Sequence, residues 1–109
     1  MNTDLPRPVM AYLAAEQAKD SAALARCFDE SGVVRDEGRE HRGVAAIEAW
    51  HRDTNAKASY VVEPLDASAG GSAVVVRARV SGDFPGSPAE LRHHFTLKGE
   101  RIALLEVTP

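Results

Sequence analysis

The sequence has little of several features on which common functions depend. Cys27 is the only cysteine among 109 residues, so no intrachain disulfide can form, and we expect a reducing, cytoplasmic environment. No apolar run approaches the roughly 20 residues that a membrane-spanning helix needs, and the first residues lack the basic-then-apolar order of a signal peptide. Basic residues form no block and the net charge is −3, so we expect neither nucleic acid nor a membrane as partner.

The motifs of several catalytic chemistries are also missing. There is no His-Glu-x-x-His or paired Cys-x-x-Cys pattern, and the four histidines are scattered without metal-ligand spacing. Glycine-rich nucleotide motifs and the Gly-x-Ser-x-Gly motif of many hydrolases do not occur. Cys27 falls on an apolar helical stripe, where burial normally makes a thiol unreactive. We therefore expect no metal, no cofactor and no cysteine nucleophile.

What is present is the composition of one ordinary globular domain over residues 1–109, with 44% hydrophobic and 27% charged residues. Apolar residues recur at helical spacing from Val9 to Ala14. The side chain of Thr3 or Asp4 can cap this first helix. A proline at position 6 is tolerated in its first turn, because the N–H groups there have no partner within the helix. The pattern predicts a helix that begins close to the N-terminus.

Two further helices are predicted before the pattern changes. Asp20 supplies a second N-cap, and the helix that follows carries an apolar stripe and ends at Ser31–Gly32. A short β-branched strand then leads from Val33 to Asp36. A third helix with an apolar stripe extends from Gly43 to near Asn55.

The second half of the chain has the period of two that is typical of strands. Four strands are predicted, at Ser59–Leu65, Ser72–Gly82, Glu90–Leu97 and Arg101–Val107. Their short separators favour antiparallel hairpins between neighbours, and Glu63 before a proline indicates a bulge or an edge strand. Helices followed by strands indicate an α+β fold with three helices packed on one face of a curved antiparallel sheet.

This order of elements resembles the nuclear transport factor 2-like superfamily, and within it the SnoaL-like and ketosteroid-isomerase-like proteins. The resemblance is carried by the segments Ala11–Asp20, Ala23–Glu30, Val33–Gly38, Arg42–Trp50 and Ser81–Pro88, and it covers nearly the whole chain. It implies a cone, in which a curved sheet wraps around helices and leaves a pocket at the open end, and it implies a homodimer. The superfamily mixes isomerases, cyclases, dehydratases, ligand carriers and interaction domains, so the resemblance does not name an activity.

The resemblance implies three catalytic positions. Asp36 matches the general-base aspartate after the first strand, and Tyr12 matches the tyrosine that donates to the substrate oxyanion. His93 stands where the isomerases have a protonated aspartic acid. A neutral carboxylic acid in an apolar site donates a strong hydrogen bond, whereas a histidine titrates near neutrality. From the residues alone, Asp36 could equally be a turn residue, because Asp and Gly both favour turns. Tyr12 could equally be a core residue.

Other aromatic residues complete the expected site. Strand alternation turns His93 and Phe95 toward the interior and His94 toward the outer face. Trp50 is expected to be core or pocket wall, and Phe84 to roof the pocket or to anchor its turn. Trp50, Phe84 and Phe95 are therefore the candidate ligand-binding residues.

Three functions are compatible with these residues. The first is an enzyme that moves a proton on a small, largely apolar carbonyl compound, as isomerase, cyclase or dehydratase. The second is a protein that binds a small apolar molecule in the same pocket without turnover. The third is a dimerisation module whose own side chains fill the pocket.

Overall fold

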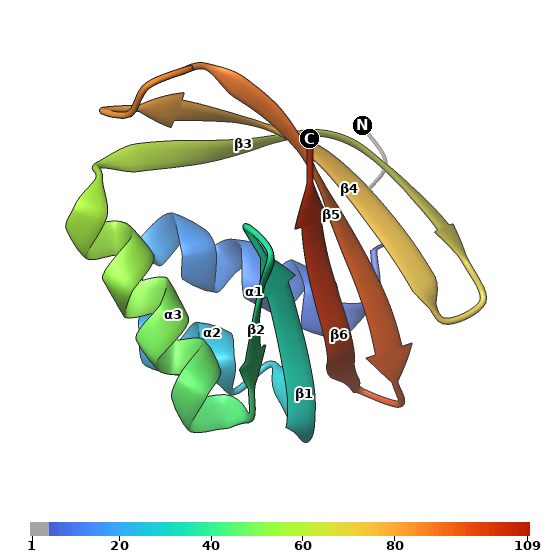
Figure 1. Ribbon diagram of the computed structural model, residues 1–109. Coiled ribbons are helices and arrows are strands. Elements are labelled where there is room, and N and C mark those ends of the chain that lie inside the picture. Colours follow the sequence, from blue (N-terminus) through green and yellow to red (C-terminus); the bar gives the residue numbers. More distant parts are fainter. Residues whose placement is uncertain (1–4) are drawn as a thin grey trace.

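The computed structural model describes residues 5–109 and contains three helices on one side of a six-stranded sheet (Figure 1). Helix α1 (Arg7–Ala18) begins after Pro6, which occupies the N-cap position without a side-chain cap. The caps expected at Thr3 or Asp4 lie outside the described residues. Proline is accommodated here because the first N–H groups of a helix have no intrahelical partner.

The short helix α2 (Ser21–Ala25) begins as the sequence predicts and ends earlier than it predicts. The side chain of Asp20 accepts a hydrogen bond from the Ala23 N–H at 3.0 Å, which confirms the cap. The predicted end at Ser31–Gly32 is wrong, because strand β1 (Phe28–Asp36) has already begun. The apolar spacing that predicted a continuing helix belongs to a helix, a turn and the start of a strand, all of which face the same core.

Six strands form one sheet in the order β2-β1-β6-β5-β4-β3 (Figure 1). The remaining elements are β2 (Arg39–Arg42), α3 (Val44–Lys57), β3 (Tyr60–Gly70), β4 (Ala73–Gly82), β5 (Ala89–Lys98) and β6 (Arg101–Thr108). The four predicted strands are confirmed as β3 to β6, and each is antiparallel to the next one along the chain. Strand β3 is an edge strand with a register shift between Pro64 and Asp66, as its proline predicts.

The sheet is mixed, which corrects the expectation of a wholly antiparallel one. Strand β1 pairs in parallel with β6, and the unpredicted strand β2 pairs with β1 as a hairpin. Glu37 and Gly38 form its turn with positive φ angles of 53° and 75°. Strand β2 was missed because its sequence is Arg-Glu-His-Arg, which has no apolar alternation to signal a strand.

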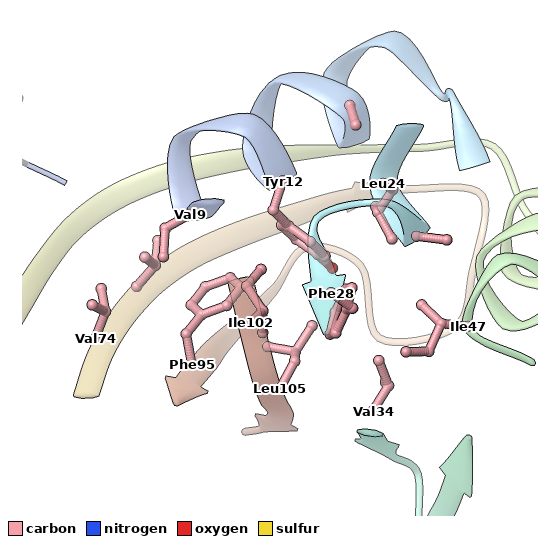
Figure 2. Packing of buried hydrophobic residues seen from close by; sticks show 13 residues of the cluster. Val9, Tyr12, Leu24, Phe28, Val34, Ile47, Val74, Phe95, Ile102 and Leu105 are labelled. Atoms are coloured by element: carbon pink, nitrogen blue, oxygen red, sulfur yellow. The ribbon is translucent and has the colours of Figure 1, made fainter. Parts of the chain in front are cut away.

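The core lies between the helices and the concave face of the sheet, where the long strands bend over α1 (Figure 1). Figure 2 shows Tyr12 pointing from α1 toward the sheet, among Phe28, Phe95 and Ile102. A second, smaller cluster joins Val62, Ala78 and Val80 to the half-buried side chains of Tyr60, Phe84 and Leu91. The sheet therefore buries two apolar clusters on one face. Among the described residues, no helix is long and apolar enough to span a bilayer.

Candidate functional site

Asp36 is the last residue of β1, and its carboxyl group is half-buried beside α3. Trp50 Nε1 donates a hydrogen bond to its Oδ2 at 3.2 Å, and the ring of His41 lies beside the indole at 6.1 Å between centroids. Burial raises the pKa of the Asp36 carboxyl, although the hydrogen bond from Trp50 opposes this change. The turn conformation belongs to Glu37 and Gly38, whereas Asp36 belongs to the strand.

Tyr12 is buried on α1, with 2% of its surface exposed. Its ring packs against Phe95 in a T-shaped arrangement with 5.2 Å between the ring centroids, and its centroid lies 6.4 Å from that of the His93 ring. Burial raises the pKa of the Tyr12 hydroxyl well above its ordinary value, and the charge of Glu16 and a smaller contribution from Asp36 act in the same direction. Tyr12 is therefore neutral at physiological pH and retains its proton for donation.

His93 is buried on the inner face of β5, as strand alternation predicts, with 7% of its surface exposed. Its Nδ1 atom has no hydrogen-bond partner among the described residues. Burial lowers the pKa of His93 from 6.5 to about 4, although the charge of Glu16 opposes the change. The imidazole is therefore neutral near pH 7, and a buried nitrogen without a partner is a rare feature in a folded protein.

The three expected ligand-binding residues are placed differently from one another. Trp50 donates the hydrogen bond to Asp36 that is described above. Phe95 is a core residue with 1% exposure that stacks on His93 at 6.3 Å. Phe84 packs against the Val62 cluster, which is separate from the core cluster that contains Phe95.

Two hollows lie on the surface of the part of the chain that the structure describes, and neither of these two is lined by Tyr12, Asp36 or His93. The first, of about 580 Å³, lies where α1, α2 and α3 meet and is lined by Ala18, Lys19, Asp20, Ser21, Ala22, Arg52 and Asn55. The second, of about 470 Å³, is lined by Arg26, Phe28, Asp29, Glu30, Ser31, Val44, Lys98 and Arg101. Within residues 5–109, no group of three or more potential metal ligands is arranged around one point.

Sequence reasoning missed a buried polar network between the helices. Ser21 Oγ lies 2.7 Å from His51 Nδ1, and His51 Nε2 lies 3.0 Å from Glu16 Oε1. Lys19 Nζ is 3.0 Å from the other oxygen of Glu16. Burial alone would raise the pKa of Glu16, but the hydrogen bonds from His51 and Lys19 outweigh it and lower that pKa.

One local signal could have revealed part of this network. Glu16 follows Tyr12 by four residues, and His51 follows Ile47 by four, so both polar residues lie on the buried stripes of their helices. A charged residue on such a stripe needs a partner. Which partner it finds depends on how α1 packs against α3, and no local pattern contains that information.

The fold recurs in solved structures. A protein from Sinorhizobium meliloti proposed to be a polyketide cyclase is 47% identical, with 96% of each chain covered and a TM-score of 0.93. A hypothetical protein with a ketosteroid-isomerase-like fold from Catenulispora acidiphila, in complex with trimethylamine, is 24% identical over 95% of this chain and 85% of that one, with a TM-score of 0.84.

A third solved structure shares the fold at lower identity. The epoxide hydrolase/cyclase-like enzyme SalBIII, which has a role in pyran ring formation in the polyether salinomycin, is 22% identical over 93% of this chain and 86% of that one, with a TM-score of 0.75. No curated protein matches the sequence. The family model of the SnoaL-like domain matches residues 9–105, and the chain therefore belongs to the SnoaL-like family, with a nuclear transport factor 2-like fold.

Proposed function

We propose that this protein is an enzyme that moves a proton on a small, largely apolar carbonyl compound without a cofactor, as an isomerase, cyclase or dehydratase. Asp36 takes a proton from the carbon next to the carbonyl group. Tyr12 and His93 donate hydrogen bonds to the oxygen on which negative charge develops. Trp50 orients the Asp36 carboxylate, and Phe84 and Phe95 supply apolar surface for the ligand.

The observation that carries the proposal is the state of Asp36. Its carboxyl group is half-buried at the end of a strand, its pKa is raised, and its charge influences the buried hydroxyl of Tyr12. A base works best when its pKa lies near the working pH, and general acid–base catalysis contributes roughly 10²–10⁴-fold. Glu16 is the other carboxylate near Tyr12, but its hydrogen bonds with His51 and Lys19 lower its pKa and make it the poorer base.

His93 supports the proposal through its unpartnered nitrogen. A neutral imidazole with the proton on Nδ1 donates one hydrogen bond, which is the role that the oxyanion requires. The Sinorhizobium meliloti relative is proposed to be a polyketide cyclase, and ring closure through an enolate is one of the reactions that such a site would serve.

A second candidate is a protein that binds a small ligand, or that only dimerises, without turnover. One observation favours it, namely that neither of the two hollows described above is lined by Tyr12, Asp36 or His93. In this alternative Phe95 and Tyr12 fill the interior of the cone themselves, and the outer face of the sheet forms the contact between two copies.

Exchange of substrate protons for deuterium separates these functions. The protein is incubated in D2O with a panel of small cyclic ketones, and loss of the proton next to each carbonyl is followed by NMR, while thermal shift reports binding. We expect exchange with at least one ketone and a loss of roughly 10²-fold or more in Asp36→Asn. Glu37→Gln is the matched control, because Glu37 is the exposed neighbour of Asp36.

The remaining outcomes select the alternatives. Binding without exchange, unchanged in Asp36→Asn, would leave a ligand carrier. Neither binding nor exchange across the panel would contradict the enzyme proposal and favour a dimerisation module.

A further inference from the structure

The network between the helices has the connectivity of a catalytic serine relay. Glu16 is ionised, because its hydrogen bonds lower its pKa, so His51 Nε2 must carry the proton that Glu16 Oε1 accepts. In the neutral tautomer with this proton, the lone pair of His51 lies on Nδ1, 2.7 Å from Ser21 Oγ, where it can accept the hydroxyl proton. Asn55 Nδ2, another donor, lies 3.4 Å from the same Nδ1 atom, which fits this tautomer.

His51 and Glu16 are buried, and the Ser21 end of the network borders the first hollow. His51 is 1% exposed, and the network is held by three helices, with Glu16 on α1, Ser21 on α2 and His51 on α3. Ser21 and Asn55 both line the hollow of about 580 Å³. The buried base and its carboxylate therefore lie behind the serine, and the serine lies at the wall of a space that could hold a ligand.

The hollow also has suitable chemistry. Its lining carries charges of both signs, from Lys19, Asp20 and Arg52, so it selects neither anions nor cations strongly. Asn55 and Arg52 carry N–H groups that can stabilise charge on a carbonyl oxygen. The Oδ1 atom of Asn55 is buried without a partner among the described residues, so this oxygen can accept a hydrogen bond from a donor group of a ligand.

We propose that Ser21 is a nucleophile activated by His51, and that the hollow in front of it takes a small ester whose acyl group is transferred to Ser21. Glu16 is the positioning residue that fixes the tautomer of His51. Such relays are recognised by geometry and not by a sequence motif, so the absence of Gly-x-Ser-x-Gly does not exclude one. This site shares no residue with Tyr12, Asp36 and His93, and it does not depend on the proton-transfer proposal.

The reaction balances with water as the second substrate. Ser21 Oγ attacks the ester carbon and gives its proton to His51 Nδ1, and the electron pair of the C=O bond moves to oxygen. When that pair returns, the bond to the alcohol oxygen breaks, and His51 gives the proton to the departing alkoxide. Water then attacks the acyl-serine, His51 takes its proton and returns it to Ser21 Oγ, and the acid is released.

Labelling with a fluorophosphonate tests the nucleophile directly. The serine oxygen displaces fluoride from phosphorus, and mass spectrometry of the intact protein and its peptides counts and locates the adduct. We expect one adduct, at Ser21, and hydrolysis of p-nitrophenyl acetate that Ser21→Ala abolishes. Ser31→Ala is the matched control, because the Ser31 hydroxyl donates its hydrogen bond to the Asp29 carboxylate at 2.6 Å, which is not a histidine base.

The base is tested by removal and chemical rescue. His51→Ala should slow labelling by roughly 10²-fold or more, and added imidazole should restore part of the rate, which a purely structural role would not allow. Glu16→Gln should slow it less. If His51→Ala does not fold, the location of the adduct in the wild-type protein and its loss in Ser21→Ala remain decisive.

Three results would overturn the proposal. They are the absence of labelling, an adduct spread equally over Ser21 and Ser31, and a rate unchanged in folded His51→Ala. Asp36→Asn should label like the wild type, so failure of this proposal and failure of the proton-transfer proposal are distinguished.

Discussion

The helix junction and the residues proposed for proton transfer differ in how far their hydrogen bonds are already made. In the helix junction, Glu16, His51 and Ser21 contact one another within 3.0 Å. Among the residues proposed for proton transfer, Asp36 accepts a hydrogen bond from Trp50, but His93 Nδ1 has no partner among residues 5–109. The Ser21–His51–Glu16 chain is therefore bonded at each link, although Asn55 Oδ1 beside it is buried without a partner in the described part of the chain, whereas His93 lacks a hydrogen bond at Nδ1 itself.

The difference has an energetic consequence. A preassembled network joins the elements that carry it, so its loss should mainly reduce stability. An incomplete cluster costs stability, because a buried polar group without a partner loses its hydration. Stability and pH measurements can therefore tell the two clusters apart without knowledge of any substrate.

The largest effect is expected in the helix junction. Glu16→Ala leaves His51 buried without its acceptor and removes the partner of Lys19. Breaking a buried pair on one side typically costs 3–5 kcal/mol, and we expect a loss of about 3 kcal/mol in the free energy of unfolding, measured with urea. Glu48→Ala removes the exposed pair with Arg52 and should cost about 0.5 kcal/mol or less. Equal losses would show that the junction is not preassembled in solution.

An intermediate effect is expected from acidification, through His93. Its pKa is about 4 in the folded protein and 6.5 as the ordinary value. Between these two pH values the unfolded state binds more protons at this histidine than the folded state does. The free energy of unfolding is therefore highest above pH 6.5, and the contribution of His93 lowers it as the pH drops toward 4. We expect His93 to contribute a loss of about 2 kcal/mol between pH 7 and pH 5.

The contribution of His93 is obtained by difference. Asp36, whose pKa is raised, acts in the opposite direction, and Glu16, whose pKa is lowered, acts mainly at lower pH. Asp36 and Glu16 are both still present in His93→Gln, so the free energy of unfolding should fall less between pH 7 and pH 5 in that variant. The same loss in both proteins would contradict a neutral, buried His93.

The smallest effect is expected at Asp36. Trp50→Phe keeps an aromatic ring against the core but removes the N–H that stabilises the carboxylate. The pKa of Asp36 should therefore rise further, by an amount that corresponds to about 1 kcal/mol, and NMR titration of the carboxyl carbon would measure it. Phe84→Leu is the control, because it removes a ring from the separate Val62 cluster. An unchanged pKa would show that the indole does not hold Asp36 in solution.

Local patterns predicted most of the secondary structure correctly. The four strands β3 to β6, the cap at Asp20 and the third helix depend on spacing and turn residues within a few positions of one another. The burial of His93 with Phe95 followed from strand alternation alone. Strand β2 was missed and the end of α2 was misplaced, because there the pairing of distant segments decides the structure. The catalytic roles of Asp36, Tyr12 and His93 remain predictions.

By itself, the sequence determined the α+β class, the order of most elements and the residue types on each buried face, because side-chain period and turn chemistry are local properties. Only the tertiary structure decided that β1 lies parallel to β6, that Trp50 holds Asp36, and that Glu16 meets a histidine 35 positions away. These contacts arise where helices and strands pack together. Burial then makes each polar partner obligatory, whatever its distance along the chain.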